Sequence, residues 1–157
     1  MTSAIARAAD AIQRAFLEGD FSPAADALAD DVVLNSPVLE RSWNTKAVVE
    51  RLGPAMVSLF EGIEFAPVIA QENQAVVSFT ARCGLVDVQL IQVLDVGEDG
   101  KVSELTIYIR PLPALLAVAK AMQARIDPAL LAAHRASTSS WGSTETAITR
   151  PGSGRHR

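Results

Sequence analysis

The apolar residues of this chain change their spacing near Gly62, from every third or fourth position to every second position. Beyond it, four segments alternate apolar and polar residues, as strands with one buried face do: 63–71, 75–83, 86–96 and 102–109. The links between these segments are short and polar, and short links join antiparallel neighbours. The second half of the body is therefore predicted to be an antiparallel sheet.

Helical spacing surrounds these strands. Ile5, Ala9, Ile12 and Phe16 share one face of a first helix. Ser22-Pro23 predicts a second helix with Ser22 as its N-cap. The elements expected before the sheet are helices over 3–18, 22–28 and 45–61, the last kinked or divided at Gly53-Pro54, and a strand over 32–39. Helices over 112–125 and 127–133 follow it. This order predicts an α+β fold: a cone-shaped, curved, mostly antiparallel sheet wrapped around helices.

Charge and residue counts exclude several classes of function. The formal net charge is -4, whereas phosphate binding needs clustered positive charge. One cysteine, Cys83, and two late histidines, His134 and His156, leave no disulfide and no cysteine- or histidine-rich metal site. No stretch approaches the ~20 apolar residues that span a bilayer, and the N-terminus lacks a signal-peptide pattern. We expect a cytoplasmic protein without metal or cofactor, and without nucleic acid or membrane as partner.

The composition changes near Ala136, where serine, threonine, glycine and arginine replace apolar residues. Such a segment buries too little apolar surface to offset its chain entropy. The predicted organisation is one domain over 1–133 and a disordered tail over 134–157.

Short stretches in a fixed order carry a family resemblance. They are Phe16–Asp20, Leu28–Leu34, Ser36-Pro37, Gly97–Val102 and Arg110–Leu115. Together with the order of elements, they resemble the nuclear transport factor 2-like superfamily, in particular its SnoaL-like bacterial members, over about residues 3–126. The resemblance implies a cone with an apolar pocket. It does not imply one activity, because the fold hosts isomerases, cyclases, hydrolases, transport factors and non-catalytic binders.

The catalytic residues of two enzyme groups in the superfamily are absent. Ketosteroid isomerases use an aspartate base, a tyrosine and a protonated aspartate, and these positions align with Ser36, Ile12 and Gln92. We therefore reject isomerase chemistry by that route. The Arg-x-Asp of the epoxide hydrolases is missing too, since Arg82 and Asp87 are five residues apart. A turn at Gly84-Leu85 would instead make them a cross-strand ion pair.

Three weak catalytic candidates remain: Ser36, Gln92 and Asp87. Gln92 interrupts an apolar row, and its buried amide must bond either to protein alone or to a ligand. Ser36 is either a ligand contact or only the short residue before a bend at Pro37. Asp87 becomes an acid–base candidate only if a slip in register turns it inward.

The predicted pocket defines two functional hypotheses. Its lining is Leu34, Ser36, Trp43, Met56, Phe60, Phe79, Leu90, Gln92, Leu105, Ile107 and Ile109, with the last helix closing the mouth. The first hypothesis is a small-molecule-binding protein for an apolar, carbonyl-bearing ligand, with at most a weak isomerase- or cyclase-type activity. The second is a non-catalytic dimeric binding or scaffold module. Whether the protein is an enzyme stays open, and a homodimer is expected through the outer sheet face around Gln89, Ile91, Val93 and Tyr108.

Overall fold

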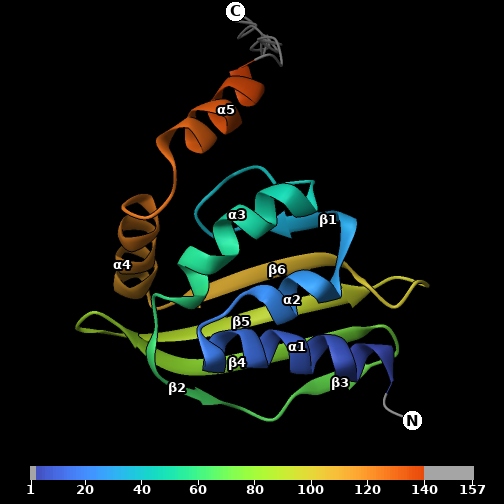
Figure 1. The fold of residues 1–157 in the computed structure, drawn as a ribbon. Helices are drawn as coiled ribbons and strands as arrows, with labels where there is room; N and C mark the ends of the chain where they lie inside the picture. The colour runs from blue at the N-terminus through green and yellow to red at the C-terminus, as the bar shows by residue number, and fades with distance from the viewer. Residues whose placement is uncertain (1–2, 140–157) are drawn as a thin grey trace, which may run out of the picture.

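The computed structural model describes residues 3–139 and has the predicted α+β architecture (Figure 1). Its elements, in chain order, are α1 (Ala4–Glu18), α2 (Ser22–Ala27), β1 (Leu28–Asn35), α3 (Lys46–Val57), β2 (Glu61–Phe65), β3 (Ile69–Gln71), β4 (Gln74–Cys83), β5 (Val86–Val96), β6 (Val102–Arg110), α4 (Leu112–Gln123) and α5 (Pro128–Ser139). No helix in this described part is long and apolar enough to span a bilayer.

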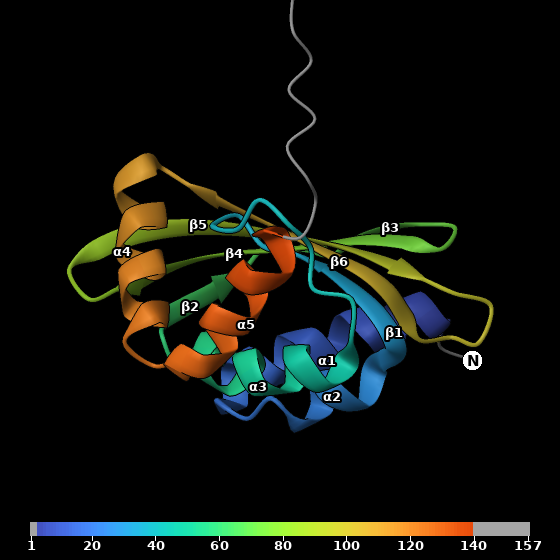
Figure 2. The same cartoon turned by 90° about the horizontal axis from the view of Figure 1, so that it is seen from above.

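One sheet organises the domain. Its strand order is β1-β6-β5-β4-β2, with β3 also paired to β4. All pairs are antiparallel except β1 with β6. Helices α1, α2 and α3 lie on one side of the sheet, and α4 crosses the end where the β4–β5 hairpin projects (Figures 1 and 2).

The core lies between the sheet and α1. The buried face of β4 carries Val77, Phe79, Ala81 and Cys83, and that of β5 carries Val88, Leu90, Gln92 and Leu94, as the two-residue alternation predicts. The ring of Phe79 packs against Phe16 of α1 at 5.0 Å and against Phe60 at 5.4 Å between centroids. These rings join α1, β4 and the segment after α3 in one aromatic cluster.

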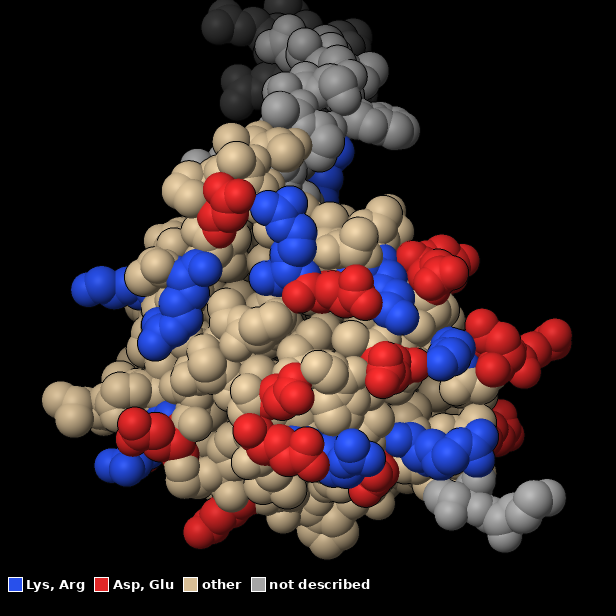
Figure 3. Space-filling view, in the orientation of Figure 1, with Lys and Arg blue, Asp and Glu red and all other residues tan. Residues whose placement is uncertain are grey.

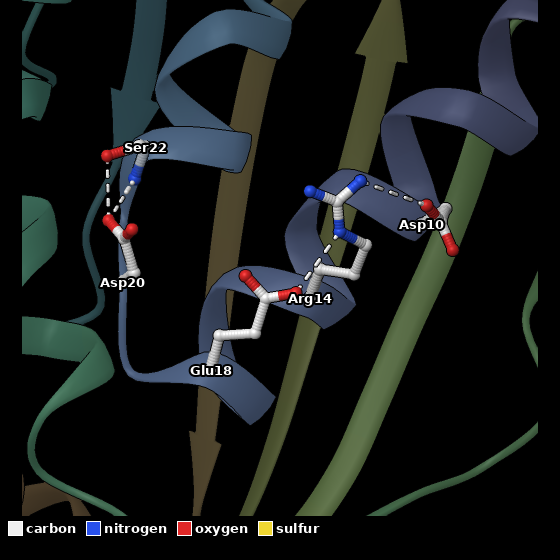
Figure 4. Close-up of polar contacts among 5 residues, drawn as sticks. All are labelled: Asp10, Arg14, Glu18, Asp20 and Ser22. Atoms are coloured by element: carbon white, nitrogen blue, oxygen red, sulfur yellow. Dashed lines mark hydrogen bonds and ion pairs between the residues drawn. The ribbon is translucent and has the colours of Figure 1, made fainter.

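Two element starts differ from the sequence prediction. The N-cap of α2 is Phe21 rather than Ser22, and no side chain caps this helix. Just before it, the Asp20 carboxylate accepts bonds from the Ser22 backbone N–H at 2.9 Å and from the Ser22 hydroxyl at 2.7 Å (Figure 4). The same view shows Arg14 of α1 between Asp10 and Glu18. Strand β1 begins at Leu28, four residues early, because Leu28 pairs with Val102 of β6.

Other boundaries also move. Helix α3 runs unbroken through Pro54 and ends at Val57. The expected strand over 63–71 is two strands, β2 and β3, on either side of Pro67, which has no N–H to give to a ladder. Helix α5 continues to Ser139, six residues into the predicted tail, and residues 140–157 lie outside the described part of the chain.

The β4–β5 hairpin has the predicted register. Cys83 pairs with Val86 and Arg82 with Asp87 across the Gly84-Leu85 turn. Arg82 forms its ion pair with a residue other than the expected Asp87, however. Arg82 lies 3.7 Å from the carboxylate of Glu61 on the other neighbouring strand, β2.

Candidate ligand cavity

A cavity of about 230 Å³ opens beside the core, where the sheet diverges from α3 and α4. Strands β5 and β6 form its floor, α1 to α3 and the segment 36–43 form its walls, and α4, residue Ile126 and Leu131 of α5 form its cover. The volume is far above the ~10–15 Å³ that one water molecule needs. The hollow therefore has room for a small organic molecule.

Most of the predicted lining residues surround this cavity. Eight of them do: Leu34, Ser36, Trp43, Met56, Gln92, Leu105, Ile107 and Ile109. Phe60, Phe79 and Leu90 do not. The two phenylalanines lie in the aromatic cluster with Phe16, and Leu90 is fully buried on β5. Strand alternation gives the correct face for Phe79 and Leu90, and helical spacing gives an inward position for Phe60, but neither pattern gives the depth along the cone.

The segment 36–43 is folded back over the cavity by hydrogen bonds at its two ends. Leu34 and Trp43 exchange two backbone bonds, of 2.7 and 2.9 Å. The side chain of Asn35 donates to Glu104 and Thr106 of β6 and accepts from the hydroxyl of Ser42. This closure places Pro37, Val38 and Leu39 in the wall.

The hydroxyl of Ser36 has a local role within that segment. It accepts a hydrogen bond of 3.3 Å from the backbone N–H of Val38, just after Pro37. This is a serine turn that stabilises the bend. The hydroxyl proton still remains for a second partner, so Ser36 serves the bend and also faces the cavity.

Gln92 is the buried polar residue on the cavity floor. Its side chain is 2% exposed, between the β4 and β6 partners Val77 and Ile107. Its Nε2 atom has no hydrogen-bond partner among the described residues. Leaving such a donor unsatisfied costs about 1–3 kcal/mol. An acceptor inside the cavity would remove that cost.

The lining is almost entirely uncharged and apolar. None of the described residues that form it carries a charge, and its polar side chains are Ser36, Gln92, Gln123 and the indole of Trp43. Asp87 is exposed on the outer sheet face, in an open depression with Arg82 and Arg110, because the register has no slip there. No group of three metal-ligating side chains occurs in the described part of the chain.

Several lining residues have no counterpart in the sequence prediction. Phe21 is the clearest, because its ring lies against Gly53 of α3 and completes one wall. Leu131 of α5 and Ile126 complete the cover. The missed signal is an apolar residue next to a helix start: Phe21 comes before Ser22-Pro23, and Leu131 follows Asp127-Pro128.

Solved structures with the same architecture define the class of fold. A steroid delta-isomerase from Pseudomonas aeruginosa superimposes with a TM-score of 0.70 and 24% identity, over 83% of this chain and 96% of the other. An uncharacterized bacterial protein with a cystatin-like fold, from Silicibacter pomeroyi DSS-3, also gives 0.70, with 21% identity over 80% and 92% of the two chains. An NTF-2 like protein of unknown function from Burkholderia xenovorans LB400 gives 0.60 and 19% identity, over 68% and 82%.

The protein therefore has the nuclear transport factor 2-like fold of the SnoaL type. Neither the protein-family models nor the curated proteins give a match to the sequence.

Proposed function

We propose that this protein binds an uncharged, mostly apolar small molecule in the cavity and that Gln92 donates a hydrogen bond to a carbonyl oxygen of that molecule. The observation that carries this proposal is that Nε2 of Gln92 has no hydrogen-bond partner within residues 3–139. The apolar walls exclude a charged ligand, because burying an uncompensated charge is very costly. A ketone combines an apolar body with the single acceptor that this amide lacks.

The same chemistry limits catalysis. An amide donor polarises a carbonyl, but proton transfer from carbon needs a base, and the described lining offers only Ser36, Gln92, Gln123 and Trp43 as polar side chains. An isomerase- or cyclase-type activity on a carbonyl ligand would therefore be weak. Binding is the primary proposed role.

The test uses pairs of ligands that differ in one oxygen. Because one similar structure is a steroid delta-isomerase, the panel starts with steroid ketones and adds aromatic ketones, each beside its parent hydrocarbon. We expect ketones to raise the melting temperature by several degrees and the hydrocarbons to raise it less.

Two leucine variants separate specific recognition from simple apolar binding. Gln92→Leu should abolish the difference between ketone and hydrocarbon. Gln89→Leu, on the same strand but on the exposed face, should keep it. The proposal fails if no compound of the panel raises the melting temperature of the wild-type protein. It also fails if Gln92→Leu keeps the preference for ketones over hydrocarbons.

The second candidate is a non-catalytic dimeric module, favoured by the outer sheet face. Ile91 and Tyr108 pair across β5 and β6 with side chains 40% and 56% exposed. Covering such a pair is typical of a protein interface. Light scattering should give twice the chain mass, and Ile91→Asp should give the monomer mass. A monomeric wild-type protein would overturn this candidate without touching the first.

A further inference from the structure

Three exposed leucines gather at the end of the molecule where α4 crosses the sheet. Leu85 is the tip of the β4–β5 hairpin and is 99% exposed, and Leu112 and Leu116 lie one turn apart on α4 at 66% and 60%. The hairpin projects beyond α4 at this same end in both views (Figures 1 and 2). We call these three residues the leucine edge.

The fold does not need these leucines. The opposite face of α4 provides the packing, through buried Ala114 and through Val118, which also lines the cavity. At the hairpin tip, Gly84 supplies the positive φ, so position 85 would accept a polar residue without strain. A fully exposed apolar side chain at a tip, beside two more on a helix, points to a contact outside the chain.

Basic side chains flank helix α4 at the leucine edge, while the carboxylates at this end, Asp87 and Glu61, lie on the strands beside Arg82. Arg110, Lys120 and Arg125 lie along α4 and its ends, and the sequence from 110 to 126 contains no Asp or Glu. Blue side chains lie over α4 at the left of Figure 3. The remainder of the chain holds the excess of acidic residues behind the net charge of -4. A negatively charged surface would therefore attract this end and repel the others.

We propose that the leucine edge docks on an anionic lipid bilayer, with Leu85, Leu112 and Leu116 in the interfacial region. The basic side chains of Arg110, Lys120 and Arg125 then lie at the lipid headgroups. Exposed leucines with basic residues nearby suit a membrane interface rather than a spanning segment, and here Lys120 lies within α4 while Arg110 and Arg125 lie just beyond its ends. The absence of a spanning segment, which makes a membrane partner unexpected from the sequence, does not bear on surface contact. A second copy fits this edge less well, because it would bring two sets of arginine and lysine together.

This docking goes beyond the proposed ligand binding and does not depend on it. Helix α4 presents its outer face to the bilayer and its inner face to the cavity. The arrangement would place the cavity cover next to the lipid phase, where apolar molecules partition.

Vesicle flotation without added ligand tests the docking. The full chain is mixed with extruded vesicles of phosphatidylcholine alone or with a quarter phosphatidylglycerol, at low salt and at 0.5 M salt, in a dilution series. We expect flotation with the anionic vesicles only, reduced several-fold by salt. Equal flotation with both vesicle types, or none with either, would overturn the proposal.

Matched leucine variants identify the surface. Leu116→Ser, and the triple change at Leu85, Leu112 and Leu116 to Ser, should lower the bound fraction by about three-fold and more than ten-fold. Leu17→Ser is the control, since Leu17 is a helical leucine of similar exposure, 64%, on α1. All are surface changes, so melting temperatures should stay within about two degrees. A triple variant that floats like wild type, or one that turns a solution dimer into a monomer, refutes membrane docking.

Discussion

The ring of Phe21 lies over the α-carbon of Gly53, so close that a Cβ on Gly53 would stand 2.4 Å from three ring carbons. This contact brings the start of α2 against the middle of α3, and both residues line the cavity. No larger residue at 53 fits without moving the ring. The size of the cavity therefore depends on a glycine inside a helix, where glycine itself is unfavourable by about 1 kcal/mol.

Gly53→Ala should move the ring of Phe21 toward the cavity. The gain in helix propensity opposes the steric cost, so we expect a net loss in unfolding free energy of no more than about 2 kcal/mol. The affinity for a cavity ligand should fall at least ten-fold. Chemical denaturation and titration of the best ketone measure the two effects. In a Phe21→Leu background the same change should be milder, and an unchanged affinity in Gly53→Ala alone would contradict this account.

Gln92→Leu should stabilise the protein without ligand. The change removes a buried donor that has no partner among the described residues and replaces it with an apolar group of similar size. Removing the desolvation cost should raise the free energy of unfolding by about 1 kcal/mol. Urea denaturation measures this, with Gln89→Leu as the exposed control. A loss of stability in Gln92→Leu would show that the amide is already satisfied by the protein.

Cys83 should be unreactive in the native state. Burial raises the pKa of its thiol, and the nearby positive charge of Arg125 opposes this only in part. The reactive thiolate is therefore scarce at neutral pH. A disulfide reagent should modify Cys83 slowly at pH 7.5 and rapidly in denaturant. Fast native labelling would mean that the end of β4 opens readily.

Asp20 should lose its stabilising contribution in acid. Hydrogen bonds from the hydroxyl and then the backbone N–H of Ser22 hold the pKa of the Asp20 carboxyl below its ordinary value. A lowered folded pKa means that the contribution is present above the unfolded pKa and is lost as pH falls through the folded pKa.

The measurement is a carbon-detected titration of the Asp20 carboxyl. In Ser22→Ala the pKa should move part of the way back toward the ordinary value, because the backbone bond remains. An unchanged pKa would show that the hydroxyl bond does not form in solution.

The sequence determined the features that depend on neighbouring residues. The alternation along β4 and β5 predicts which side chains face inward, Gln92 included, and the Gly84-Leu85 turn predicts the register from Arg82 to Asp87. Both predictions are confirmed because the strand period and the turn conformation depend only on residues a few positions apart in the sequence. Strand alternation accounts for six of the eight expected residues that surround the cavity, all except Trp43 and Met56.

Only the tertiary structure decided where the hollow lies. The early start of β1 comes from its parallel pairing with β6, some 70 residues away, and the Phe21–Gly53 contact from the packing of two helices. The same holds for the depth that separates Phe79 from Gln92 along the cone. It also holds for the lack of a partner for the Gln92 Nε2 atom in the part of the chain that the structure describes. No local pattern encodes these, because each results from the distance and angle between elements that meet only when the whole chain is packed.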